Sequence, residues 1–239
     1  MSLNATDLSV KIFADGADKD QIRNASANPL IKGFTTNPTL MRKSGVTNYA
    51  AFAREVIEII PNHSLSLEVF ADDLHEMERQ AREIATWGKN VYVKVPISNT
   101  KGESTAPILE SLSKDGIKIN VTALMTEAQV MSTVEALSAD VPSYISVFAG
   151  RVADTGIDPI PLMRRSLSIM EAAPESELIW ASPREVLNVV QASEIGCHII
   201  TVTYDILNKL NSLGKDLDAF SLDTVKMFYS DASDSGFSI

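Results

Sequence analysis

A short apolar run followed by an amphipathic stretch recurs about eight times along this chain of 239 residues. The runs are rich in β-branched and aromatic residues, which is typical of buried strands. Alternating strands and helices predict parallel strands that are joined by crossover helices. The predicted strands cover residues 10–15, 33–36, 65–70, 91–96, 117–122, 144–148, 178–181 and 198–202.

The stretches between these runs have helical spacing. Residues 48–60 place Phe52 and Val56 on one apolar stripe, and Thr126 has the position of a helix cap. Pro183 is expected near the first turn of a helix, where its missing N–H is tolerated.

Eight such units predict an α/β fold, a (β/α)₈ TIM barrel of parallel strands, since this fold takes roughly 250 residues. We expect a single domain over residues 1–239, with residues 221–239 forming a C-terminal helix and tail. The rival is a doubly wound sheet. It is disfavoured because the sequence has neither G-x-G-x-x-G nor a P-loop.

Composition narrows the function classes. The formal net charge of −10 argues against nucleic acid, and no apolar stretch approaches the ~20 residues that span a bilayer. Cys197 is the only cysteine, which excludes an internal disulfide and fits a reducing compartment. The N-terminal residues lack the features of a signal peptide. We therefore expect a cytoplasmic protein without membrane or nucleic-acid partners.

Lys94 is the most informative residue for function. It lies in the run V-Y-V-K-V-P, where a charged side chain is rarely buried without a partner or a task. Burial favours a neutral amine, which can attack a carbonyl group and form a Schiff base. A lysine that reaches solvent from a strand end is the simpler alternative.

Polar side chains stand at seven of the eight predicted strand ends, where TIM barrels carry their active sites. Carboxylates there can move protons, amides and hydroxyls can bind sugar hydroxyls, and arginines can bind phosphate. The candidate residues are Asp15, Thr36, Asn37, Glu68, Lys94, Asn120, Thr122, Ser146, Arg151, Ser182 and Arg184.

Several motifs resemble the transaldolase family over nearly the whole chain. The blocks T-T-N-P-T-L at residues 35–40 and V-K-V-P at 93–96 are the most specific, and F-A-D-G, I-N-V-T, S-V-F-A-G-R and A-S-P-R accompany them. The short length and the final residues 228–239 resemble the small transaldolase and fructose 6-phosphate aldolase branch.

The resemblance implies that Lys94 forms a Schiff base with a ketose phosphate, without a metal or an organic cofactor. Asp15 would take the proton of the C4 hydroxyl, and Glu68 and Thr122 would hold a water molecule that shuttles protons. A dihydroxyacetone unit would pass from fructose 6-phosphate or sedoheptulose 7-phosphate to an aldose phosphate, as in the pentose phosphate pathway. The implied substrate-binding residues are Thr36, Asn37, Asn120, Ser146, Phe148, Arg151, Ser182 and Arg184.

Two positions separate this activity from its alternative, a fructose 6-phosphate aldolase that releases free dihydroxyacetone. Enzymes resembling that aldolase have Gln where this chain has Glu68 and Tyr where it has Phe148. Both residues therefore favour the transferase. The chain also departs from larger transaldolases, because Val147 replaces a usual proline.

A barrel that has lost its activity and a metalloenzyme are two competing hypotheses. The intact Lys94, Asp15 and Glu68 disfavour the first, and the three scattered histidines disfavour the second. His198 beside Cys197 is expected to be a strand residue rather than half of a catalytic dyad.

The resemblance and the last predicted helix bear on the assembly. Small relatives form rings, often decamers, so we expect a homo-oligomer, a pentamer or decamer. The apolar stripe of Leu222, Val225, Phe228 and Tyr229 could pack on a neighbouring subunit or on its own barrel.

Overall fold

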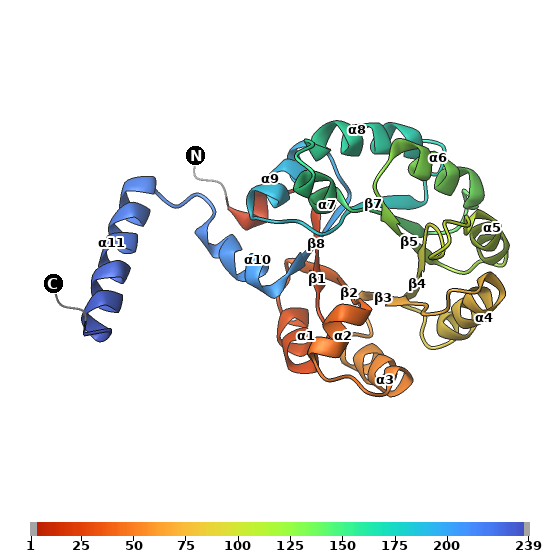
Figure 1. Ribbon diagram of the computed structural model, residues 1–239, viewed down its shortest axis with the longest axis horizontal. Helices are drawn as coiled ribbons and strands as arrows, with labels where there is room; N and C mark the ends of the chain where they lie inside the picture. The colour runs from red at the N-terminus through yellow and green to blue at the C-terminus, as the bar shows by residue number, and fades with distance from the viewer. Residues whose placement is uncertain (1–3, 237–239) are drawn as a thin grey trace.

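The computed structural model describes residues 4–236, and its eight parallel strands form a closed barrel in chain order (Figure 1). Helices surround the strands, so the predicted (β/α)₈ fold is confirmed. The strands are β1 (Lys11–Asp15), β2 (Ile31–Thr35), β3 (Ser64–Glu68), β4 (Val91–Pro96), β5 (Ile119–Leu124), β6 (Ser143–Val147), β7 (Ser176–Trp180) and β8 (Ile199–Thr203).

The outer helices begin where the sequence provides caps. Thr126 accepts a hydrogen bond from the backbone N–H of Gln129 at the start of α6, as predicted, and Phe52 and Val56 are buried on α3. The helices are α1 (Lys19–Ser26), α2 (Pro38–Lys43), α3 (Tyr49–Ile59), α4 (Leu74–Ala85), α5 (Ala106–Lys114), α6 (Glu127–Ala136), α7 (Ala149–Asp154), α8 (Pro159–Met170), α9 (Leu187–Glu194) and α10 (Tyr204–Lys209), with short 3₁₀ turns η1 (Ala5–Asp7) and η2 (Leu210–Ser212).

The helix predicted to begin near Pro183 begins later, and that prediction is wrong. α9 starts at Leu187. The backbone N–H groups of Arg184 and Glu185 donate to Asn188 Oδ1, which holds the preceding residues as a loop. This loop belongs to the end of the barrel that contains the candidate site.

Successive strand residues face opposite sides of the sheet. The outward side chains, such as Leu67, Val93 and Trp180, are fully buried in the main core between barrel and helices. The inward side chains form a second cluster inside the barrel. The site is therefore supported from two sides, by an outer apolar core and by the packed interior.

Aromatic rings fill the interior at the end where the strands begin. Tyr144 stacks on Tyr92 with ring centroids 3.9 Å apart, and Phe13 meets Tyr144 edge-on at 5.6 Å. Gly33 makes room for this packing, because a Cβ there would lie 2.6 Å from the Phe13 ring. We call the five residues Phe13, Tyr92, Tyr144, Ile179 and Ile199 the aromatic plug.

Helix α11 (Leu217–Asp234) projects away from the barrel and has no buried residue (Figure 1). It begins at Leu217 rather than at residue 221, and the last three residues of the predicted tail lie outside the described residues. Val225, Phe228 and Tyr229 are 59%, 62% and 77% exposed, so the apolar stripe does not pack on its own barrel. Between residues 4 and 236, no helix combines the length and the apolar character that a membrane span requires.

Candidate active site

A cavity of about 600 Å³ opens where the barrel strands end, above the aromatic plug. Residues from β1 to β6, from β8 and from the loops that follow the strands line it, which is the expected position of an active site in this fold. Ten of the twelve predicted site residues contribute to its wall: Asp15, Asn37, Glu68, Lys94, Thr122, Ser146, Phe148, Arg151, Ser182 and Arg184.

Lys94 and Glu68 form a buried ion pair in the wall of this cavity. The β3–β4 register sets them side by side, and Lys94 Nζ lies 3.3 Å from Glu68 Oε2. Lys94 also donates a hydrogen bond to the carbonyl oxygen of Thr36 at 3.2 Å, and 7% of the residue is exposed. A primary amine is thus held in place, almost without solvent contact, next to a carboxylate.

Asp15 ends β1 and faces the same cavity. Its Oδ1 accepts a hydrogen bond from Thr35 Oγ1 at 2.7 Å, and its Oδ2 accepts a longer one from Asn37 Nδ2 at 3.4 Å. Burial raises the pKa of Asp15 above its usual value, while Lys94 and the Thr35 hydrogen bond oppose that rise. A carboxylate with a raised pKa suits a group that takes up and returns a proton.

Thr122 reaches the cavity from an irregular part of β5. Its buried Oγ1 has no hydrogen-bond partner within residues 4–236, so it is available to a bound water or substrate hydroxyl. The next residue, Ala123, has φ 67°, and Ser182 across the cavity has φ 60°. These are the non-glycine residues with positive φ in the described chain, and both line this cavity.

Asn120 and Thr36 are not among the residues that line this cavity, and their substrate contacts stay predictions. Asn120 is fully buried, and its Oδ1 accepts from Ser146 Oγ at 2.7 Å while its Nδ2 donates to Ser66 Oγ at 2.9 Å. Thr36 faces outward and donates to the Ser66 carbonyl oxygen at 3.0 Å. Asn120 therefore supports Ser146, and Thr36 contacts Lys94 through its backbone.

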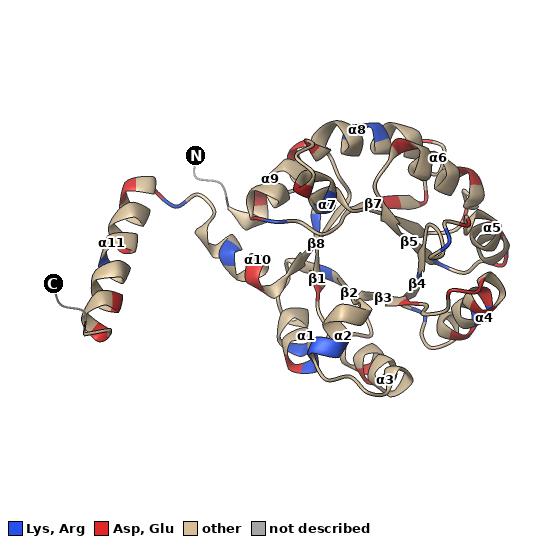
Figure 2. Ribbon diagram, in the orientation of Figure 1, with Lys and Arg blue, Asp and Glu red and all other residues tan. Residues whose placement is uncertain are grey.

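The cationic side of the cavity is formed by α7 and the loop after β7. Arg151 lies over the Phe148 ring, 5.3 Å from its centroid. Figure 2 shows acidic and basic residues spread over the helices that surround the barrel. Arg184 Nη1 donates to Ser182 Oγ at 3.2 Å. A Cβ on Gly150 would lie 1.6 Å from the Ser182 carbonyl oxygen, so this close approach of α7 requires glycine.

Three polar residues of this region were given no role in the predicted site. Asp154 pairs with Arg184 through both carboxylate oxygens, and the hydrogen bonds from Arg184 lower the pKa of Asp154. Thr35 and Thr201 line the cavity and share a hydrogen bond of 2.6 Å. The alternation of inward residues along β2 and β8 could have indicated the two threonines, whereas Asp154 lies on a helix and gives no such signal.

Cys197 and His198 lie at the other end of the barrel and do not form a dyad. Cys197 Sγ donates to the Leu178 and Ile199 carbonyl oxygens, and burial raises its pKa to about 12. His198 Nδ1 accepts the Leu178 backbone N–H at 2.9 Å. His198 lies just before β8 rather than in the strand, and both side chains bond to the backbone of β7.

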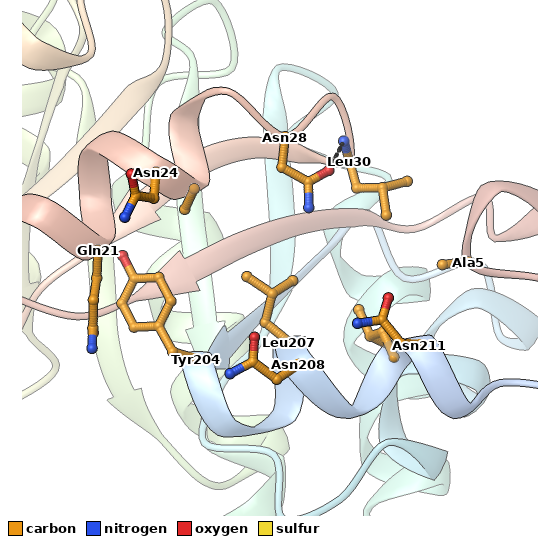
Figure 3. Close-up of a pocket in the computed structure, with 11 residues that line it drawn as sticks. Ala5, Gln21, Asn24, Asn28, Leu30, Tyr204, Leu207, Asn208 and Asn211 are labelled. Atoms are coloured by element: carbon orange, nitrogen blue, oxygen red, sulfur yellow. Dashed lines mark hydrogen bonds between the residues drawn. The ribbon is translucent and has the colours of Figure 1, made fainter.

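A second pocket, of about 330 Å³, lies between α1 and α10 on the outside of the barrel (Figure 3). Carboxamides from both helices face it, and Tyr204 has the only ionisable side chain among the described residues that line it. The Tyr204 ring packs so closely on Gly16 that a Cβ there would lie 2.5 Å from Cε2. With no cationic group among those lining residues, this pocket is a poorer candidate for an anionic substrate than the cavity at the strand ends.

Comparison with known proteins gives one family. The sequence model described as Transaldolase/Fructose-6-phosphate aldolase matches residues 12–239. A probable transaldolase of Dehalococcoides mccartyi is 35% identical over 202 residues, which cover 84% of this chain and 90% of that protein. A probable transaldolase of Methanococcus maripaludis is also 35% identical over 202 residues, covering 84% of this chain and 89% of that protein.

Solved structures with much lower identity share the fold. KGPDC from Streptococcus mutans superposes with a TM-score of 0.55 at 9% identity, covering 81% of this chain and 88% of that chain. The structure of 2,3-dimethylmalate lyase gives a TM-score of 0.54 at 11% identity, covering 99% of this chain and 90% of that chain. These likenesses concern the barrel alone.

Proposed function

Since this chain belongs to the transaldolase/fructose-6-phosphate aldolase family, we propose that it is a transaldolase. It would transfer a dihydroxyacetone unit from fructose 6-phosphate or sedoheptulose 7-phosphate to an aldose phosphate, in the cytoplasm, as part of the pentose phosphate pathway. The observation that carries the proposal is the buried Lys94 amine, 3.3 Å from Glu68 Oε2 in a cavity that also contains Asp15 and two arginines.

In the first stage, Lys94 Nζ attacks the ketone carbon of the donor, and loss of water gives a protonated Schiff base. Glu68 is close enough to Lys94 to exchange protons with it through a bound water. The free hydroxyl of Thr122 provides a second hydrogen-bonding group for that water. The positively charged imine then acts as the electron sink, so no metal is needed for this role.

In the second stage, Asp15 takes the proton of the C4 hydroxyl as the C3–C4 bond breaks. The electrons of that bond move toward the imine nitrogen, and the aldose product leaves while an enamine stays on Lys94. The enamine then attacks the aldehyde carbon of an aldose phosphate acceptor, and Asp15 returns the proton to the new hydroxyl. Water hydrolyses the resulting Schiff base, which releases the ketose phosphate product and regenerates the Lys94 amine. The raised pKa of Asp15 supports this double role, because the carboxyl group must both accept and donate.

Arg151, Arg184 and Ser182 are proposed to bind the terminal phosphate of the donor and the acceptor. Asp154 occupies the Nε–Nη2 edge of Arg184, so Nη1 remains directed to Ser182 at the cavity wall. Arginine and serine donors at one place form the charge-assisted contacts that a phosphate group requires. Asn37 and Ser146 are the proposed partners of the dihydroxyacetone hydroxyls, with Asn120 holding Ser146 in position.

Transfer is favoured over the alternative aldolase reaction by Phe148. This ring lines the cavity but has no hydroxyl group that could protonate the enamine and release free dihydroxyacetone. The three-carbon unit would therefore remain on Lys94 until an acceptor arrives. Glu68, which replaces the glutamine of enzymes resembling the aldolase, supports the same assignment.

Steady-state assays with fructose 6-phosphate, with and without erythrose 4-phosphate, test this proposal. We expect turnover that depends on the acceptor, little free dihydroxyacetone, and no activity in Lys94→Met. Phe148→Tyr should increase release of free dihydroxyacetone without acceptor, and Phe148→Leu is the matched control. Free dihydroxyacetone as the main product of the unchanged protein would assign it to the aldolase reaction instead.

We also propose that the protein is a homo-oligomer, a pentamer or decamer, in which α11 packs on a neighbouring subunit. Support comes from the large apolar side chains of α11, including Leu222, Val225 and Phe228, which are at least half exposed in the single chain. Burying each would remove a substantial apolar area from water. Light scattering should show an oligomer that Val225→Asp with Phe228→Asp dissociates, and a monomeric unchanged protein would contradict this.

A further inference from the structure

Thr201 of β8 connects to the catalytic carboxylate through a second threonine. Thr201 Oγ1 lies 2.6 Å from Thr35 Oγ1, and Thr35 Oγ1 lies 2.7 Å from Asp15 Oδ1. Both distances are in the normal range for hydrogen bonds between oxygen atoms. Thr35 and Thr201 are almost completely buried, so solvent does not compete strongly for either hydroxyl. The three side chains form one continuous hydrogen-bonded chain.

The barrel geometry explains why these residues meet. β1 lies between β2 and β8 and pairs Asp15 with Thr35 and Phe13 with Thr201. Inward residues of alternate strands share a layer inside a barrel of this type. Thr35 and Thr201 therefore come together in the layer beneath Asp15. Thr201 thus gives β8 a polar residue at the cavity, whereas the sequence had provided no candidate site residue on this strand.

The number of available protons fixes the direction of the hydrogen bonds. A threonine hydroxyl has one proton to donate, and an ionised carboxylate has none. Thr35 must therefore donate to ionised Asp15, and Thr201 must then donate to Thr35. We propose that Thr201 is a positioning residue that donates to Thr35 and, through it, keeps Asp15 ionised and oriented toward the substrate hydroxyl. The substrate part of this inference rests on the proposed function.

The surroundings of Asp15 make such support necessary. Burial raises its pKa, and the nearby Glu68 carboxylate acts in the same direction. Lys94 and the Thr35 hydrogen bond act in the opposite direction and favour the ionised form. Tyr204 of α10 packs on Gly16, the residue after Asp15, but its own pKa is raised by burial and then by Asp18 and Asp15, so it stays neutral. Because linked hydrogen bonds strengthen one another, Thr201 makes Thr35 a better donor.

The direct test is a carbon-13 NMR titration of the Asp15 carboxyl group in the unchanged protein and in Thr201→Val, which removes the hydroxyl and keeps the shape. We expect Asp15 to titrate at higher pH in Thr201→Val and at its original pH in Thr201→Ser. Thr86→Val, at an exposed position that follows α4, is the matched control. An unchanged Asp15 titration in a folded Thr201→Val protein would overturn the proposal. This readout does not depend on turnover, so it remains decisive if the proposed function fails.

Kinetics give a second readout that a purely structural role would not produce. Thr201→Val should lower kcat roughly two- to tenfold, the usual size of one neutral hydrogen bond, with little change in KM. The acidic limb of its pH profile should shift to higher pH. The double variant with Thr35→Val should behave like Thr35→Val alone, because Thr201 acts through Thr35. If the losses of kcat in the two single variants add up in the double variant, the linked chain is contradicted. If the unchanged protein forms no trapped Schiff base, only the proposed function is contradicted.

Discussion

At the end of the barrel where the strands begin, Phe13, Tyr92 and Tyr144 close the interior with aromatic rings. At the end where the strands finish, Lys94 and Glu68 face an open cavity of about 600 Å³. The aromatic plug removes apolar area from water and is closely packed, and both effects stabilise the folded domain. The second holds buried charges together, which rarely stabilises a fold as well as apolar residues of similar volume do.

This difference separates the roles of the two ends. Substitutions in the aromatic plug should reduce the free energy of unfolding, and activity should fall only through the loss of folded protein. Substitutions at the cavity should reduce activity and leave stability unchanged or improved, a known trade-off at functional sites. Four substitutions test whether the two ends are separate in this way, and the one with the strongest effect comes first.

Lys94→Met should reduce turnover by at least about 10³-fold, because covalent catalysis loses its nucleophile. The melting temperature should stay the same or rise, since an apolar side chain replaces a buried charge. Turnover and thermal unfolding are measured on the same preparation. A folded Lys94→Met protein that keeps normal turnover would remove Lys94 from the mechanism.

Tyr144→Ala should reduce the free energy of unfolding by about 3–5 kcal/mol, as expected when a large buried aromatic side chain is truncated. The kcat of the protein that remains folded should be close to normal. Met131→Ala on α6 is the control, because Met131 is 49% exposed and lies outside both the plug and α11. Urea unfolding followed by fluorescence measures the stability of both variants. A large fall in the kcat of the folded Tyr144→Ala protein would show that the two ends are not separate.

Arg151→Ala should raise KM for fructose 6-phosphate by about 10- to 100-fold, the range expected for loss of a charged hydrogen-bond partner. The kcat/KM for unphosphorylated fructose should change little. The ratio of the two substrates measures the phosphate contribution directly. Equal effects on both would show that Arg151 acts on the shape of the cavity rather than on the phosphate group.

Asp15→Asn should raise the free energy of unfolding at neutral pH by about 1 kcal/mol, the usual size of a single stabilising change. Its folded pKa is raised by burial, so the ionised carboxylate destabilises the folded state above that pKa. Below the ordinary value of 3.8, both states are protonated and the difference should vanish. Chemical unfolding at several pH values tests this, and a destabilised Asp15→Asn protein at neutral pH would contradict it.

The fold and much of the site follow from local patterns in the sequence. The strands at residues 91–96 and 143–147, for example, are short runs rich in β-branched and aromatic residues. Parallel strands in one barrel bring their carboxyl ends to the same side. The sequence pattern therefore predicts that Lys94, Glu68 and Asp15 lie at one cavity. The alternation of strand residues also indicates that Thr35 faces inward and Thr36 does not, as observed.

The remaining details depend on relations between segments, which local patterns do not contain. Asn120 faces inward as expected, but its hydrogen bonds to Ser66 and Ser146 join three strands, and such contacts are not contained in the sequence of any one strand. Asp154 pairs with Arg184 across thirty residues of sequence, and a lone acidic residue on a helix gives no signal of such a pairing. α9 begins at Leu187 rather than near Pro183, because the Asn188 side chain accepts the Arg184 backbone N–H and holds these residues as a loop. The position of the proline does not reveal this side-chain hydrogen bond.

The central claim is that Lys94 carries the three-carbon unit, and mass spectrometry after borohydride reduction tests it most directly. The protein is incubated with fructose 6-phosphate, reduced, digested and compared with Lys94→Met treated in the same way. We predict one reduced three-carbon adduct on the peptide containing Lys94, and none in the variant. An adduct on another lysine, or no adduct although the donor is turned over, would contradict the claim.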